Sequence, residues 1–218
     1  MTDQSDGSTR PKPDPTAAPP TADTSVNTII DISAHLSHEI VDGAKNQANE
    51  LVHLPLMLLQ FLRNPIAFIK QTPDLKTPTW VTLTVFSGVM GSFVNAAIHQ
   101  SWLRFFIALF ILPTGSFLAV FATTSILKII FRGGYGLNFR YRSGASIFAF
   151  ANLFWWIPAG VGDSLPPLSL LGFIVALMIA GVGFVEKLGL PKNHVLKWFS
   201  VLAIVHAVLW SLGRWLDF

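Results

Sequence analysis

Cysteine is absent from the 218 residues, and charged side chains are scarce. Without thiols the chain can form no disulfide, no thiolate metal site and no cysteine nucleophile. Asp, Glu, Lys and Arg make up 12% of the residues, against about 25% in ordinary soluble domains. Nine of the twelve acids precede Pro78, so only Asp163, Glu186 and Asp217 follow it. A long and nearly acid-free sequence of this kind indicates helices that cross a lipid bilayer.

Apolar runs with few or no charges predict five transmembrane helices. The clearest begins with 23 residues that carry no charged side chain, Phe105 to Leu127. At about 1.5 Å per residue, such a helix crosses about 30 Å of hydrocarbon. The expected fold is all-α, with a disordered tail and an amphipathic interfacial helix ahead of five membrane helices. The expected spans are residues 78–98, 105–130, 143–161, 168–185 and 196–212.

Three regions are expected along the chain. Residues 1–24 contain five prolines and no apolar residue larger than Ala after Met1, which predicts a disordered tail. Residues 25–75 repeat apolar side chains at steps of three and four, which predicts amphipathic cytoplasmic helices. Their later part, residues 54–69, either lies among lipid headgroups or packs against the membrane helices. Residues 76–218 form the membrane domain.

Basic residues are shared unevenly between the two ends of the expected spans. Cytoplasmic loops retain Lys and Arg because moving these charges across a bilayer is costly. The asymmetry predicts a cytoplasmic N-terminus, a C-terminus on the opposite side and no nucleic-acid partner. Only Arg104 and Arg214 then lie outside, and ten lie inside: Arg63, Lys70, Lys76, Lys128, Arg132, Arg140, Arg142, Lys187, Lys192 and Lys197.

The basic loop between the second and third spans surrounds a turn of three glycines and a tyrosine, residues 133–136. Arg132, Arg140 and Arg142 are expected to contact anionic lipid headgroups, each contributing about 1 kcal/mol near the surface. The turn lacks the Gly-Lys-Ser/Thr ending of a phosphate-binding loop.

A few polar and small residues inside the spans are candidates for specific contacts. Asn95, Asn152 and His206 are candidates for an intramembrane polar cluster, since polar groups in a span need partners. His206 serves either as a neutral hydrogen-bonding group or in a proton relay, and the lack of an acid in any span favours the first. Small residues four apart let helices approach closely, so helix-packing contacts are expected at Gly88, Gly91, Gly172, Ala176 and Ala180.

The sequence predicts no catalytic activity, no cofactor and no metal. No expected span contains Asp or Glu, so a Ser-His-acid arrangement cannot form within the membrane. His35 and His38 share a predicted helix face with Glu39 beside them, but no further fixed ligand is evident, so we interpret this pattern as a solvated surface.

The segment from Leu127 to Pro158 has a Gly-rich basic loop and then a span of small and aromatic residues that ends at a proline. A short basic segment, residues 186–194, precedes the last span, and Arg63-Asn-Pro65 leads into the first. Over about residues 55–215, this arrangement resembles the Yip1 domain family. The resemblance implies five spans and, as in eukaryotic relatives, a role in membrane traffic or shaping.

One family feature is missing. Eukaryotic members carry Asp-Leu-Tyr-Gly-Pro ahead of the first span, where this chain reads Gln-Thr-Pro-Asp-Leu-Lys-Thr-Pro over residues 71–78. GTPase binding is therefore not carried over. The chain is more similar to prokaryotic members, which implies a bacterial inner membrane.

Two functions remain open from the sequence. The first is a non-catalytic protein that organises the bilayer or partner proteins, with anionic lipids, a membrane-protein partner or a second copy as its contacts. The second is a transporter or channel subunit for a small solute or lipid. It would use the helix kink expected at Pro113 together with Asn95, Asn152 and His206.

Overall fold

The computed structural model describes residues 48–161 and 166–215. The chain divides into two compact units, and the described residues all belong to the second, Asn46–Phe218. The predicted tail of residues 1–24, the predicted helix over residues 25–47, the His35–Glu39 pattern and Asp163 lie outside the described residues. Residues 48–63 are helical. The helices that follow are α2 (Pro65–Gln71), α3 (Thr77–His99), α4 (Trp102–Tyr135), α5 (Tyr141–Ala151), α6 (Leu153–Ala159), α7 (Pro166–Glu186) and α8 (Lys192–Trp215).

Four of these helices, α3, α4, α7 and α8, are long and apolar enough to cross a membrane. They coincide with four of the five expected spans and make the protein a multi-pass helical membrane protein. The expected third span, residues 143–161, is not one long helix. It is divided at Asn152 into α5 and α6, each too short to cross a bilayer alone.

Apolar character alone does not reveal the division at Asn152 or the surroundings of α5. α5 is not a lipid-facing span: its residues from Ser143 to Ala151 are all buried by the surrounding helices. At the junction the Asn152 side chain bonds across to α4. Within α6, Pro158 has no N–H to donate to the Phe154 carbonyl.

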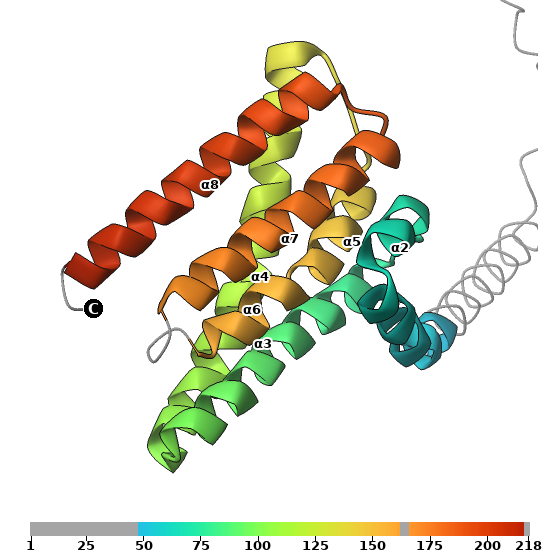
Figure 1. Ribbon diagram of the computed structural model, residues 1–218. Helices are drawn as coiled ribbons and strands as arrows, with labels where there is room; N and C mark the ends of the chain where they lie inside the picture. The colour runs from blue at the N-terminus through green and yellow to red at the C-terminus, as the bar shows by residue number, and fades with distance from the viewer. Residues whose placement is uncertain (1–47, 162–165, 216–218) are drawn as a thin grey trace, which may run out of the picture. The chain divides into compact units, whose positions relative to one another are not determined.

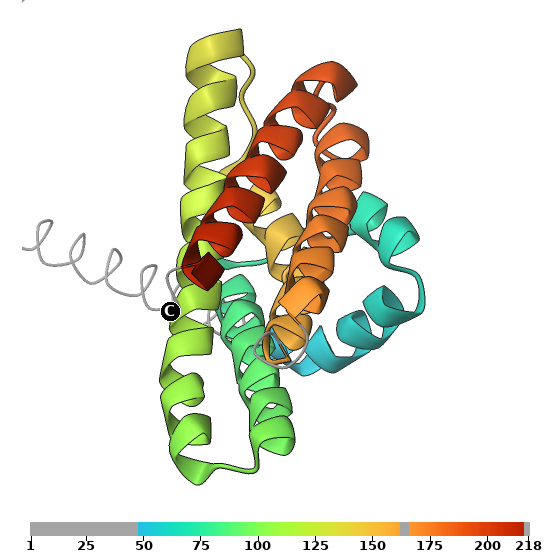
Figure 2. The same cartoon turned by 60° about the vertical axis from the view of Figure 1, so that its left-hand side comes forward.

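The successive helices run back and forth between the two ends of the bundle (Figure 1, Figure 2). α3 runs away from α2, α4 returns, α5 and α6 run away in sequence, α7 returns, and α8 runs away again. The α4–α5 and α7–α8 connections therefore lie at the same end as α2. The α3–α4 connection lies at the opposite end.

Aromatic side chains join helix 48–63 and α2 to the bundle. The Phe61 ring is fully buried, with its centroid 5.2 Å from that of Phe150 in α5 and 5.5 Å from that of Phe154 in α6. Phe68 of α2 packs edge-on against Phe150 at 4.8 Å. Edge-to-face contacts of this kind stabilise by about 0.5–1.5 kcal/mol beyond area burial. The segment before the first span is thus part of the folded domain.

Glycines allow backbones to touch where α3 crosses α4 and α6. A side chain at Gly88 would collide with the backbone of Pro113, and one at Gly91 with the carbonyl oxygen of Trp156. Gly172 of α7 leaves equally little space, because a Cβ there would lie 2.5 Å from the Phe154 carbonyl oxygen. Ala176 and Ala180, further along α7, are buried. These are the five positions at which the sequence predicts helix packing.

Replacing Gly88 by alanine should destabilise the domain, because the new methyl group has to displace the backbone of α4. We expect a loss of about 1–3 kcal/mol, measured as a lower midpoint of thermal unfolding in detergent. Gly134→Ala is the matched control, since it also lies in a helix and no atom lies within 4 Å of its added Cβ. That control should be neutral or stabilising. Equal behaviour of the two variants would contradict the close approach of α3 and α4.

Candidate functional site

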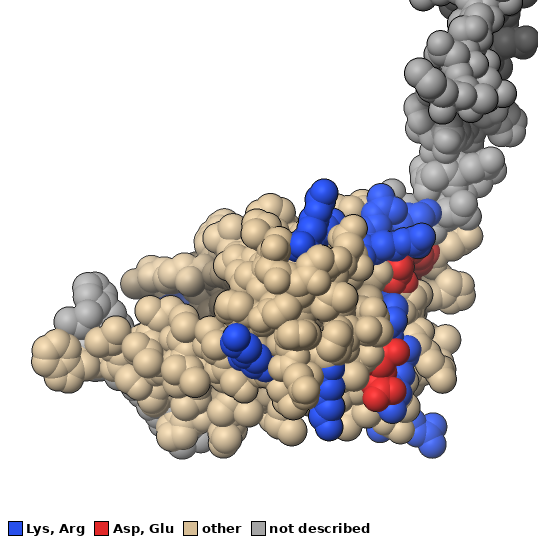
Figure 3. Space-filling view, turned by 90° about the horizontal axis from the view of Figure 1, so that it is seen from above, with Lys and Arg blue, Asp and Glu red and all other residues tan. Residues whose placement is uncertain are grey.

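Lys and Arg side chains gather at the end of the bundle where α4 and α7 finish (Figure 3). Arg132 lies in the last turn of α4, and Arg140 and Arg142 flank the start of α5. All three side chains are exposed, so they can reach a ligand outside the protein. Their contact with anionic headgroups stays a prediction.

Two carboxylates, neither of them among the predicted site residues, fix the segment that enters α3. Glu50 of helix 48–63 accepts a hydrogen bond from the Lys76 backbone N–H at 3.1 Å and one from the Thr79 hydroxyl at 2.8 Å. It thereby satisfies a donor at the N-terminus of α3, where negative charge is favourable. Glu50 lies 26 residues before Lys76 in the sequence, so no local sequence signal indicated this contact.

Asp74 joins the same segment to α5 and to the α7–α8 connection. Its carboxylate accepts a hydrogen bond from the Ser143 hydroxyl at 2.8 Å and one from the Lys187 ammonium at 2.6 Å. Burial by itself raises the pKa of the Asp74 carboxyl. The hydrogen bonds from Lys187 and Ser143, with the positive charges of Lys187 and Arg140, outweigh burial and hold that pKa below its ordinary value of 3.8.

Deeper in the bundle, hydroxyl and amide groups from three segments bond to one another. The Ser87 and Ser116 hydroxyl oxygens lie 2.9 Å apart, and each is placed to donate to the Thr84 carbonyl oxygen. The Asn152 amide donates to the Ser116 oxygen at 2.6 Å. We call these four residues the polar seam. It joins α3, α4 and the α5–α6 junction close to the proline at position 113.

Asn95, Asn152 and His206 have different sets of partners. The Asn95 amide donates to the Gly160 carbonyl oxygen at 3.2 Å, whereas Asn152 belongs to the polar seam. The His206 ring stacks on Phe173 at 3.8 Å between centroids and meets Trp155 edge-on at 5.1 Å. Each group therefore has its own structural environment. Asn152 is accompanied by two serine hydroxyls and the Thr84 carbonyl, and none of these three residues was among the predicted site residues.

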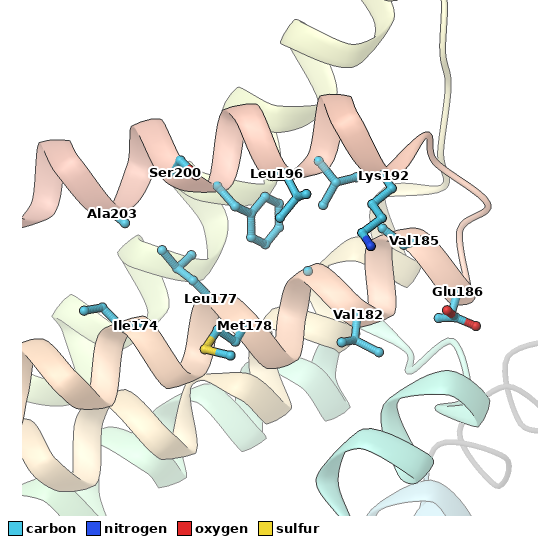
Figure 4. A pocket seen from close by; sticks show the side chains of 13 residues that line it. Ile174, Leu177, Met178, Val182, Val185, Glu186, Lys192, Leu196, Ser200 and Ala203 are labelled. Carbon is cyan, nitrogen blue, oxygen red and sulfur yellow. The ribbon is translucent and has the colours of Figure 1, made fainter.

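A groove of about 500 Å³ lies between α7 and α8 (Figure 4). Its walls are chiefly apolar side chains, and Glu186 and Lys192 lie at its basic end. A much smaller cavity, of about 20 Å³, lies beside Asn152 and Trp155. That volume is enough for about one water molecule. The groove between α7 and α8, at about 500 Å³, is large enough to hold part of a ligand.

Within residues 48–161 and 166–215, no three His, Asp or Glu side chains are grouped so that they could hold a metal ion. Comparisons of the chain with protein-family models, with curated proteins and with solved structures found no match.

Asp74→Asn should lower stability by about 1 kcal/mol at neutral pH, because the Lys187 pair and an ionised acceptor are lost. Because the pKa of Asp74 is lower in the folded than in the unfolded state, its ionised carboxylate stabilises the fold above about pH 4. That contribution disappears as the pH falls through the folded-state value. The thermal midpoints of wild type and Asp74→Asn should therefore converge on acidification from about pH 7 to pH 3.

Glu186→Gln is the control for this titration. Its ion pair with Lys70 is longer, at 3.6 Å, and both side chains are about half exposed. We expect a change of about 0.5 kcal/mol or less. A gap between wild type and Asp74→Asn that stays constant with pH would refute the role given to the Asp74 charge.

Proposed function

We propose that this protein is a non-catalytic membrane protein of the Yip1 type that organises the bilayer at its basic end. Helix 48–63 supplies the observation that carries the proposal, because it is apolar on two opposite faces. One face, with Leu54 and Phe61, is buried in the bundle. On the other, Val52, Leu56, Leu59 and Leu62 are each more than half exposed.

The exposed row needs an apolar environment. Its members recur at steps of three or four, which places them along one face of the helix. Burying a leucine side chain is favourable by about 1.5–3 kcal/mol. Exposed arginine at position 63 and exposed Ile66 follow directly, a combination typical of helices that insert among headgroups. In this proposal one face of the helix packs on the bundle and the other enters the leaflet. Both interpretations of residues 54–69 then hold, each for a different face.

The proposed orientation places the basic end in the cytoplasm and the N-terminus with it. The α5–α6 pair over residues 141–159 covers about 28 Å of helix axis, enough to serve as the fifth crossing despite its division. The C-terminus then lies on the opposite side. Under this proposal the location is the inner membrane of a bacterium, and the partners are anionic lipids and either a membrane protein or a second copy.

A transporter or channel subunit is the second candidate. The observation that favours it is the polar seam, which lies where α4 contains a proline and α5 gives way to α6. Polar groups at such irregular places in membrane helices occur at transport sites. In this protein they also hold helices together, so measured flux decides between the two functions.

The orientation is tested by single-cysteine labelling, to which the absence of native cysteine is well suited. Gly134→Cys reports on the basic end, and Ser101→Cys on the α3–α4 connection. In intact cells an impermeant thiol reagent should label Ser101→Cys strongly. It should label Gly134→Cys only after lysis. The reverse pattern would invert the proposed topology.

The bilayer-organising role is tested with the full chain in liposomes that contain anionic lipid. Wild type should shift the vesicle diameters seen by electron cryomicroscopy. The double variant Leu56→Asp/Leu59→Asp should abolish most of the shift, because two charges cannot enter the apolar part of the leaflet. Gln60→Asp adds one charge at the edge of the exposed row, so it should retain more of the shift than the double variant.

The same vesicles provide the test of the alternative. Solute or lipid flux above that of empty vesicles, reduced by Asn152→Leu, would favour the transporter and count against the organising role. Unchanged vesicle diameters with wild type would also contradict that role.

A further inference from the structure

The groove between α7 and α8 is shaped for an elongated apolar ligand. Its α7 wall includes Ile174, Leu177 and Met178, and its α8 wall includes Val195, Phe199 and Ala203. Only 11% of the most apolar window of α8 is buried, so this helix leaves much of its surface to the bilayer. The stick view shows Ile174, Leu177 and Met178 on α7 and Ala203 on α8 beside this groove (Figure 4).

The length of the groove matches one leaflet. Its lining residues run from Ile174 to Glu186 on α7 and from Lys192 to Ala203 on α8. At about 1.5 Å per residue, both walls are about 17 Å long. Half of a hydrocarbon core of about 30 Å is about 15 Å. The groove therefore extends from the basic end to about the middle of the bilayer, the depth that a single acyl chain occupies.

The groove suits a narrow, elongated ligand. It holds about 500 Å³ between α7 and α8. A narrow acyl chain could follow the groove with contacts on both walls.

The charged end of the groove identifies the headgroup chemistry. Lys192 reaches across the end of the groove from α8 (Figure 4). In the described part of the chain its ammonium has no salt-bridge partner, whereas Glu186 is paired with Lys70. An unpaired cation at the end of an apolar groove complements a phosphate attached to an acyl chain.

We propose that this groove is a binding site for an anionic glycerophospholipid of the leaflet at the basic end. One acyl chain lies between α7 and α8, and the phosphate pairs with Lys192. The proposal requires only that these helices cross a bilayer, so it does not rest on the bilayer-organising role.

Gly181 allows a direct test of the acyl-chain part. It lines the groove, and a Cβ built there meets the Phe199 side chain at an ordinary 3.6 Å. At that distance an added Cβ displaces nothing, and the longer side chain of Gly181→Leu is chosen to fill part of the groove. Gly181→Ala adds one methyl group and is its control. Lys192→Gln tests the headgroup contact. Its control is Lys197→Gln, a second exposed lysine of α8 outside the groove lining.

The experiment measures phosphatidylglycerol retained by the purified full chain, by native mass spectrometry from detergent. Phosphatidylethanolamine forms a parallel arm. Wild type should retain one phosphatidylglycerol, and more of it than of phosphatidylethanolamine. Lys192→Gln should reduce phosphatidylglycerol retention about fivefold. Gly181→Leu should reduce it similarly through lost packing contacts, while both controls match wild type.

Three outcomes would overturn the proposal. Unchanged retention in Lys192→Gln and Gly181→Leu would show that the lipid binds elsewhere. An equal loss in Lys197→Gln would show that charge attracts lipid without a defined site. A dimer lost in Gly181→Leu, with lipid retention unaffected, would assign the groove to a second copy. Thermal midpoints recorded alongside identify any variant that fails to fold, and Lys192→Gln, on an exposed side chain, keeps the test decisive.

Discussion

Polar groups inside a bilayer depend on hydrogen-bond partners within the protein, because the bilayer core contains no water to supply them. The polar seam meets this constraint with hydroxyl and amide groups from α3, α4 and the α5–α6 junction. Such bonds need the helices close together. The glycine contacts of α3 with α4 and α6 provide that approach. The two features depend on each other. The hydrogen bonds of the polar seam need the short distance between helices that the glycines allow, and those bonds in turn hold the helices together.

The two ends of the domain are stabilised by different means. At the basic end, Glu50 and Asp74 bond to the segment entering α3, to α5 and to the α7–α8 connection. Each of these two carboxylates accepts hydrogen bonds from the protein, and Asp74 also pairs with the Lys187 ammonium. At the opposite end, Arg104 contacts the His99 ring at 3.1 Å. The charge asymmetry that orients a membrane protein is therefore also part of what holds the basic end together.

The arrangement of apolar surface connects the two proposals about lipid. Helix 48–63 exposes a leucine row beside the basic end, and α7 and α8 form a groove that opens at the same end. Both features would engage the same leaflet, one by insertion and the other by holding a single chain. Under the two proposals, the exposed row of helix 48–63 and the groove between α7 and α8 contact lipids of one leaflet. The two proposals can be tested independently, because their residues belong to different helices.

Membrane class, the four long spans and the one-sided distribution of basic residues could all be read from the sequence. They follow from local composition, since a run of about 20 uncharged residues has few other stable environments. The division at Asn152, the central position of α5 and the partners of Glu50 and Asp74 could not be read in the same way. A buried helix and a lipid-facing helix are equally apolar, and a serine that packs looks the same as one that bonds across a crossing. Those distinctions depend on which backbones touch, and only the tertiary structure decides that.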